Sequence, residues 1–460
     1  MNDVTFMTAR ELATAIRQRR VSAIEVLEAY LAQIARHNPA LNAIVTLDEE
    51  GARQRAQAAD AALMRNEVWG PLHGVPITLE DAHATAGLRS TWGGYPSFAT
   101  HVPSESSTVP ARLQAAGAII LGKTHGPAIW EDSVFGRTNN PWDLARTSGG
   151  SSAGPAAAVA AGLTALDIGL DTLGSIQNPA HYCGIFGMRP TEHRVPLTGV
   201  FFLDSIRKFR IMSVTGPMAR DVEDLRLALQ IISGPDGHDS HVPPVLWRER
   251  ARPAWRELRI AWASTFPGMP IAQEIRTRIE KLALELEQSG VQMEQRLPEI
   301  DFLAQAQLGG HLASLLASAI EFRGSLVDPQ TEGKPVGSLG DYLLALQRRD
   351  GFMAAWEEFF TKWDALVCPA GPITAERHTD TIPVVDGVVV PDDQVELLGI
   401  PYSLSPVSGC PTVVIPLAQD HNGLPFGVQV MGRHWDDERL LAIAELLSEV
   451  TGGFQRPPGY

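Results

Sequence analysis

The sequence predicts an α/β fold built around one mixed sheet. After Gly70, short apolar runs alternate with helical stretches, and the apolar runs are GVPITL, GAIILG, LRIAWAS, DALVCPA, TVVIPL and GVQVMG. Such alternation is typical of strands that are separated by helices. The chain has 460 residues, which is enough for one large domain or two ordinary ones, and it contains no internal repeat.

Two helices are predicted within the first 40 residues. Thr8 with Glu11, and Ser22 with Glu25, each match the S/T-x-x-E pattern of a capping box. Apolar residues follow the second box at helical spacing, so we expect that helix to continue until Pro39 stops it. Farther along, residues 233–257 are turn-rich and predict a surface excursion, and residues 303–361 predict a helical cover over one side of the sheet.

The composition excludes several classes of function. The formal charge of −15 argues against nonspecific binding to nucleic acid, which needs a basic face. Three cysteines, Cys183, Cys368 and Cys410, are too far apart for a metal knuckle, and an odd count makes a poor disulfide framework, which indicates a reducing cytoplasm. The charged N-terminus predicts no secretory signal, and no apolar run is long enough to span a membrane.

Neither a nucleotide site nor a metal site is predicted. Residues 117–124, GAIILGKT, match the phosphate-loop pattern GxxxxGK(S/T). Their four spacer residues are apolar and predict a buried strand, and HGP follows in place of a helix start, so the match lacks its context. The thirteen histidines show no HExxH spacing, and we expect no metal or other cofactor.

The segment 147–191 carries the strongest functional signal. It reads TSGGSSAGPAAAVAAGLTALDIGLDTLGSIQNPAHYCGIFGMRPT, a Gly/Ser-rich loop that leads through an alanine helix into a second tight loop with Ser175. Gly149, Gly150 and Gly174 permit backbone conformations that side chains would forbid. A run of backbone amides that ends at a serine can form a hollow for an anion.

With these loops, the chain resembles the amidase signature hydrolases over nearly its whole length. The resemblance includes VSAIEVLEAYLAQIARHNPALNAIVTL, PLHGVPI, LGKT, TNNPWDLARTSGGSSAG, DTLGSIQNPAHYCGIFGMRPT, GPMARDVEDL and GLPFGVQVMGRHWDDERLLAIAELL, in that order. It implies a single α/β/α domain over residues 1–460, in which helices cover a large, twisted mixed sheet. The core signature region would be 70–220 and the helical cover about 300–361.

The resemblance also assigns catalytic roles. The family's nucleophile falls on Ser175, and the serine that follows a cis peptide bond falls on Ser151, 24 residues earlier. Ser152 is its neighbour, with a structural role. Amides around Thr172, Leu173, Gly174 and Ser175 would form the oxyanion hole.

The sequence departs from the family pattern at the catalytic base. The family's lysine lies in G-x-P-x-x-x-K-D, and this chain has Glu80 at the lysine position. Gln177 and Asn178 occupy positions where the family often has an arginine, and Leu173 replaces the commonest glycine. An ordinary glutamate has a pKa of about 4.3 against about 10.4 for lysine, so it is a far poorer acceptor for a serine proton.

Three interpretations of Glu80 remain open. The chain could be an amidase-fold relative or variant that is catalytically silent and only binds a ligand. It could be an amidase, acting through Ser175 or with Glu80 activating water directly. The preferred interpretation is deamination of an enamine dicarboxylate, because a buried glutamate can act as acid and then as base.

The enamine interpretation resembles a branch of the family that deaminates 2-aminomuconates and their chlorinated forms during the breakdown of nitroaromatic compounds. Glu80 would be the general acid/base, and the amides of 172–175 with Ser152 would hold a substrate carboxylate. Gln177, Asn178, His83 and Arg207 are weaker candidates for substrate binding. We expect a small carboxylate substrate, release of ammonia, no nucleic-acid or membrane partner, and a possible homodimer.

Overall fold

An eight-stranded mixed sheet forms the centre of the molecule in the computed structural model, which describes residues 4–126, 133–200, 211–321 and 337–460. The strand order is β10-β9-β11-β15-β14-β7-β8-β6. The first three strands are parallel to one another, and all later neighbours are antiparallel. The α/β fold with a large mixed sheet is confirmed. The strands are β6 (Leu166–Asp171), β7 (Phe186–Arg189), β8 (Val214–Ala219), β9 (Arg259–Trp262), β10 (Gln292–Gln295), β11 (Ala365–Pro369), β14 (Thr412–Gln419) and β15 (Pro425–Met431).

A second sheet of three strands lies beside this one. It comprises β1 (Ile44–Leu47), β3 (Ile119–Thr124) and β2 (Pro76–Glu80), in that order. The expectation of one sheet was therefore incomplete. Side-chain hydrogen bonds connect β2 to β6 and to the residues just before it: Thr164 accepts from the Thr78 amide, and Asp167 accepts from the Thr78 hydroxyl. Every residue of β3 is buried, which confirms the strand interpretation of GAIILGKT.

Both predicted N-terminal capping boxes are present, in α1 (Ala9–Arg17) and α2 (Ala23–Leu41). The predicted stop at Pro39 is wrong, because α2 continues through it to Leu41. The helix ends where Asn42 adopts a left-handed conformation, with φ of 54°. The Asn38 side chain then accepts the amides of the next residues, Ala43 and Ile44.

The remaining elements surround the two sheets. The residues expected to form a turn-rich excursion, 233–257, are largely irregular. The further helices are α3 (Glu49–Met64), α4 (Thr108–Ala115), α5 (Ala153–Ala160), α6 (Gln177–Cys183), α7 (Val222–Ile232), α8 (Gln273–Gln288), α9 (Phe302–Glu321), α10 (Leu339–Lys362), α11 (Asp392–Val395), α12 (Ile400–Ser408) and α13 (Asp437–Thr451). Two short ribbons pair β4 (Asn139–Asn140) with β5 (Asp143–Thr147), and β12 (Val384–Val385) with β13 (Val388–Val389).

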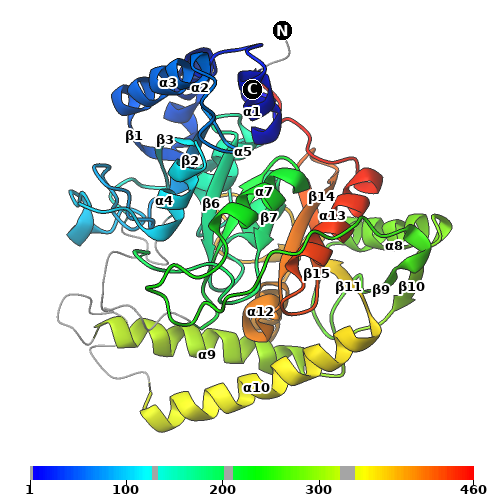
Figure 1. The fold of residues 1–460 in the computed structure, drawn as a ribbon. Helices are drawn as coiled ribbons and strands as arrows, with labels where there is room; N and C mark the ends of the chain where they lie inside the picture. Colours follow the sequence, from blue (N-terminus) through cyan, green and yellow to red (C-terminus); the bar gives the residue numbers. More distant parts are fainter. Residues whose placement is uncertain (1–3, 127–132, 201–210, 322–336) are drawn as a thin grey trace.

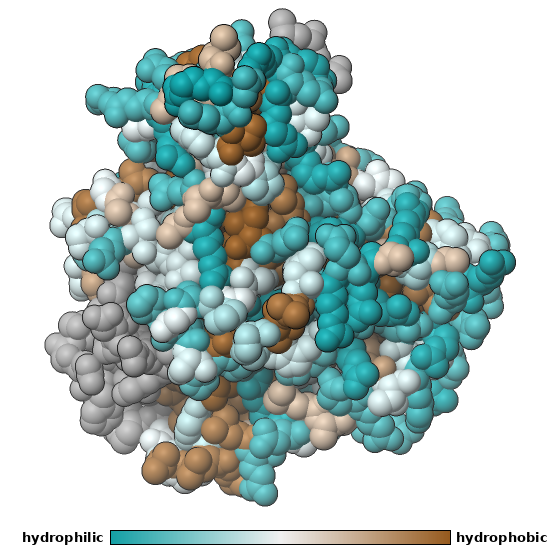
Figure 2. Space-filling model, viewed as in Figure 1, coloured by the Kyte–Doolittle hydropathy of each residue, from teal (hydrophilic) through white to brown (hydrophobic). Residues whose placement is uncertain are grey.

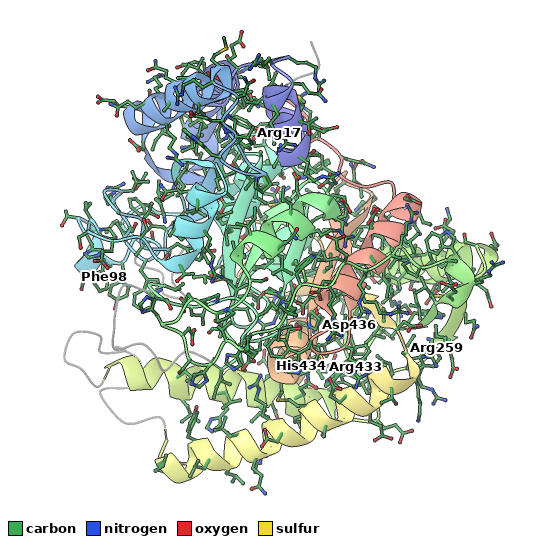
Figure 3. The ribbon with its side chains drawn as sticks, in the orientation of Figure 1. Arg17, Phe98, Arg259, Arg433, His434 and Asp436 are labelled. Carbon is green, nitrogen blue, oxygen red and sulfur yellow. The ribbon has the colours of Figure 1, made fainter. Side chains whose placement is uncertain are left out.

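The helices expected between residues 303 and 361 are α9 and α10, which run beside each other along one edge of the molecule, below α12 (Figure 1). The indole of Trp356 in α10 is buried and donates to Gln305 of α9 at 3.0 Å. Arg433 lies with His434 and Asp436 in the loop between β15 and α13 (Figure 3), and its guanidinium pairs with Glu357 of α10 at 3.2 Å. The cover is thereby attached to the sheet at both α12 and this loop.

The visible surface mixes polar and apolar residues (Figure 2). Hydrophobic residues gather near the start of α10, where Leu339, Leu343 and Leu344 are exposed. Within the described ranges, no helix combines the length and the apolar character that a membrane span requires.

Candidate active site

Glu80 is the last residue of β2, and its side chain is only 2% exposed. One carboxyl oxygen, Oε2, lies 2.7 Å from the Ser152 hydroxyl and accepts the Leu170 amide at 2.9 Å. Burial raises the pKa of Glu80 to about 8, and the carboxyls of Asp167 and Asp81 add to the rise, whereas the two hydrogen bonds oppose it. Glu80 is therefore mostly protonated at pH 7 and titrates just above neutrality.

Two further titratable groups are buried next to Glu80. Asp167 accepts hydrogen bonds from Thr78 and Thr124, and burial raises its pKa to about 7. Lys123 in β3 is fully buried and donates to the His83 carbonyl and the Thr85 hydroxyl. Burial lowers the pKa of Lys123 to about 8, against the pull of the nearby carboxyls.

Sequence reasoning missed this cluster of charges. Lys123 belongs to GAIILGKT, which is predicted only as a buried strand, and a lysine at the end of an otherwise apolar strand was the available signal. Asp81 was visible in the family's K-D pattern, and its carboxylate accepts the amides of Thr91 and Gly93. Asp81 and Lys123 thus bind different parts of the loop that follows β2, Asp81 through the amides of Thr91 and Gly93 and Lys123 through His83 and Thr85.

His83 does not lie at an exposed rim. Its side chain is buried, and its main chain pairs with Val200. Burial, with the nearby charge of Lys123, lowers the pKa of His83 to about 3, so the ring is neutral over the physiological range. Arg207 lies outside the described residues.

The peptide bond between Gly150 and Ser151 is cis, as the resemblance implies. Gly149 has φ of 84°, and a Cβ atom there would come within 2.3 Å of the Asn178 side-chain oxygen, so this position requires glycine. The Ser152 amide donates to the Ser175 carbonyl at 3.1 Å and joins the two loops. Ser151 and Ser175 are half-buried and Ser152 is buried.

The Ser152 hydroxyl is bound by protein groups, which favours the structural role of this residue over the predicted binding of a substrate carboxylate. Its hydroxyl lies between Glu80 and the Leu170 carbonyl, which is 3.0 Å away. Among the described residues, Ser152 is thus the member of the serine loop that contacts Glu80. The contact between Ser152 and Glu80 is one that sequence reasoning did not anticipate.

The loop that carries Ser175 is organised by Asp171, the last residue of β6. Its carboxylate accepts the amides of Gly174 at 3.0 Å and Ile176 at 2.8 Å. Arg189 of β7 pairs with the same carboxylate at 2.9 Å, and both side chains are fully buried. Sequence reasoning overlooked this pair, since the Asp of DTLGS and the Arg of GMRPT are separated along the chain.

The amides predicted to form the oxyanion hole are not equivalent. The Gly174 amide already donates to Asp171, so it is not free to donate to a substrate oxygen. Within the described part of the chain, the amides of Leu173 and Ser175 have no acceptor. Thr172 is held by its hydroxyl, 2.9 Å from that of Ser213.

Gln177 and Asn178 are both turned toward the protein. Gln177 is buried, and its side-chain nitrogen lies 3.4 Å from the Asp171 carboxylate. The oxygen of Asn178 accepts the Gly150 amide at 3.1 Å, and its nitrogen donates to the Tyr402 hydroxyl at 2.9 Å. These contacts argue against the predicted role of either side chain in binding a substrate carboxylate.

Comparisons with known proteins agree on the family. The model of the family described as Amidase matches residues 25–441. A glutamyl-tRNA(Gln) amidotransferase subunit from Symbiobacterium thermophilum is 32% identical, with 95% of each chain covered, and its namesake from Moorella thermoacetica is 31% identical, with 99% of each covered. The solved structure of 6-aminohexanoate cyclic dimer hydrolase covers 99% of this chain and 99% of its own, with a TM-score of 0.85 and 22% identity. A structure described as "An unexpected vestigial protein complex reveals the evolutionary origins of an s-triazine catabolic enzyme" covers 98% of this chain and 100% of its own, with a TM-score of 0.83 and 27% identity.

The family model and the relatives support a hydrolase of the amidase type that acts on carbon–nitrogen bonds. The chain belongs to the amidase signature family.

The predicted deamination of a 2-aminomuconate is contradicted. The full-length relatives are amidotransferase subunits, and the family is that of the amidases. The amidase alternative fits these observations better.

Proposed function

We propose that this protein is an amidase that hydrolyses a small amide through Ser175, with Glu80 as the proton acceptor. The observation that carries the proposal is the burial of Glu80 against Ser152, which raises the pKa of the carboxyl to about 8. Burial lowers the pKa of the neighbouring Lys123 to about 8 as well. A buried carboxylate and a buried amine are therefore bases of similar strength here, although they differ by about six pKa units in water.

The proton reaches Glu80 along the serine loop. The Ser175 hydroxyl attacks the amide carbon while its proton passes to Ser151, whose own proton moves by way of the Ser152 hydroxyl to the Glu80 carboxylate. The amides of Leu173 and Ser175 stabilise the negative charge on the carbonyl oxygen. The amine leaves with the returned proton, and water then hydrolyses the acyl-enzyme to a carboxylic acid and free Ser175.

This use of Glu80 sets the pH dependence of the reaction. Glu80 accepts a proton only as a carboxylate, and its pKa of about 8 means that this form grows as the pH rises through neutrality. The rate should therefore increase by close to tenfold per pH unit below pH 7 and level off above about pH 9. An ordinary glutamate would give a rate that is already level at pH 6.

The test is an assay of amide hydrolysis with a panel of small primary amides, together with labelling of Ser175 by a fluorophosphonate. We expect turnover by the wild type, loss of turnover and labelling in Ser175→Ala, and loss of turnover in Glu80→Gln. Glu80→Lys restores the family's base among the carboxyls of Asp81 and Asp167 and should retain turnover. A wild type that binds small carboxylates but neither hydrolyses amides nor reacts with the phosphonate would make the protein a binding module.

The partner and the compartment belong to the same proposal. We infer a small-molecule substrate, and the three buried, unpaired cysteines suit a reducing cytoplasm. The relatives are described as subunits. A complex with a second kind of chain is therefore an alternative to the homodimer that the sequence predicts. Light scattering of the purified protein, at a mass of 49.8 kDa per chain, separates the monomer from the dimer.

A further inference from the structure

Asn178 connects three parts of the catalytic site that are distant in the sequence. Its oxygen accepts the amide of Gly150, which precedes the cis bond to Ser151. Its nitrogen donates to the hydroxyl of Tyr402 in α12. Its own backbone amide donates to the Gly174 carbonyl at 2.8 Å, next to the nucleophile.

The surroundings leave Asn178 little freedom. A Cβ atom on Gly149 would meet its oxygen at 2.3 Å, and a Cβ atom on Gly174 would meet the Tyr402 side chain at 2.7 Å. The serine loop, the nucleophile loop and α12 are thus packed directly against each other at these two glycines. Both ends of the side-chain amide are bound by protein groups, so the protein fixes its orientation.

We infer that Asn178 is a positioning residue, which fixes the Gly150–Ser151 peptide relative to Ser175 through one hydrogen bond and is itself held by Tyr402. This inference rests on the proposed amidase function. The family often has an arginine in this part of the loop, and here an amide occupies the position and faces the protein. Asn178 acts through Ser151, because proton transfer between the two serines requires their hydroxyl groups to be aligned within a fraction of an ångström.

Tyr402 is the support for this arrangement. Its side chain is half-buried, and desolvation raises the pKa of the phenol above its ordinary value, so the hydroxyl stays neutral and accepts from Asn178 at every pH of interest. The neighbouring Tyr182, one helical turn beyond Asn178 in α6, is buried, and its pKa is raised for the same reason. The Asn178 contact is thus set by neutral groups and should not vary with pH.

The experiment combines steady-state kinetics with hydrogen exchange on the full-length protein. In Asn178→Ala we expect kcat to fall by about 100-fold with KM nearly unchanged, from a misplaced serine loop. Exchange at the Gly150 amide, followed in peptides that span residues 147–152, should become about tenfold faster, because the amide has lost its acceptor. Labelling of Ser175 by the fluorophosphonate should slow in parallel with kcat.

Conservative variants separate positioning from a general loss of structure. Asn178→Asp keeps an acceptor for Gly150 and should retain slow exchange and most of kcat. Tyr402→Phe removes the acceptor for the Asn178 nitrogen, together with the contact of the hydroxyl with Tyr182, and should cause a smaller fall in kcat. Asn422→Ala, at an exposed turn residue, is the matched control and should change nothing.

Two results would overturn the inference. A rise in KM in Asn178→Ala, with kcat and the exchange at 147–152 unchanged, would make Asn178 a substrate-binding residue. Slow exchange retained in Asn178→Asp, together with a loss of kcat equal to that of Asn178→Ala, would show that the Gly150 hydrogen bond does not carry the effect. A wild type that hydrolyses no amide would contradict the proposed function. The exchange measurements would still decide whether Asn178 fixes the position of the serine loop.

Discussion

Replacing Glu80 with glutamine should inactivate the enzyme and make it more stable. Glutamine has nearly the shape of a protonated glutamate, and its side-chain oxygen can accept from both Ser152 and the Leu170 amide, as Oε2 of Glu80 does. It cannot accept a proton. We therefore expect kcat/KM for amides to fall by at least about 100-fold, which is the usual scale for loss of a general base.

The gain in stability follows from the pKa of Glu80, which is about 8 in the folded protein against an ordinary value of 4.5. A carboxyl whose pKa is raised by folding stabilises the folded state fully below its ordinary pKa, and this contribution is lost as the pH rises through the folded pKa. Between pH 4.5 and pH 8, the wild type must take up a proton in order to fold. At about 1.4 kcal/mol per pH unit, this costs the wild type about 3 kcal/mol at pH 7.

The assay is urea unfolding of the wild type and Glu80→Gln at pH 5, 6, 7 and 8. The variant should gain under 1 kcal/mol at pH 5 and about 4 to 5 kcal/mol at pH 8. Surface variants such as Glu249→Gln supply the control, because an exposed glutamate should show no such trend. A stability difference that does not change with pH would refute the buried, protonated state of Glu80 and, with it, the use of Glu80 as a base near neutrality.

Four other substitutions test the remaining parts of the site and the fold. Ser152→Ala should lower kcat by about tenfold to 100-fold, because it removes the hydroxyl between Glu80 and the serine loop; unchanged kinetics in a folded variant would exclude this path. Asp171→Asn leaves Arg189 buried without its countercharge, and a loss of about 3–5 kcal/mol should appear in chemical denaturation; a loss under 1 kcal/mol would contradict the role given to the pair. Gly174→Ala should destabilise the protein by more than about 1 kcal/mol and slow turnover, because φ is 83° and the new methyl group would meet Tyr402, whereas Gly452→Ala has the same positive φ in open space and isolates the backbone contribution. Thr8→Ala should lower the free energy of unfolding by about 1 kcal/mol, because the helix cap is lost, and thermal melts should show a slightly lower melting temperature. Thr8→Ser should restore both values.

The sequence allowed the fold to be predicted well because its signals are local. Capping boxes and apolar runs are read from neighbouring residues, and both N-terminal boxes and the six apolar runs occur where they were expected. Pro39 misled for the same reason: a proline near a helix end does not fix the last residue, which here depends on Asn42 and on the Asn38 side chain. The division into two sheets was not predictable, since it depends on which strands pair across long stretches of chain.

The site was predictable in its identities but not in its contacts. Family motifs place Ser151, Ser175 and Glu80 in the chain, yet motifs do not say that Glu80 reaches Ser152, or that Asn178 spends both ends of its amide on the protein. Burial of Glu80 was part of the preferred interpretation, but the size of the pKa shift could not be predicted, for a related reason. The pKa of a free glutamate applies in water, whereas the pKa in the folded protein depends on burial, which arises from elements far apart in the sequence.

The two catalytic halves of this molecule sit on separately hydrogen-bonded frameworks. The strand β2, which carries Glu80, belongs to the three-stranded sheet, and the nucleophile loop extends from β6 at the edge of the larger sheet. Side-chain hydrogen bonds connect the two sheets. Asp167 accepts one from the Thr78 hydroxyl and one from the Thr124 hydroxyl. The distance from base to nucleophile is therefore adjustable by substitutions at these contacts that leave both ladders intact.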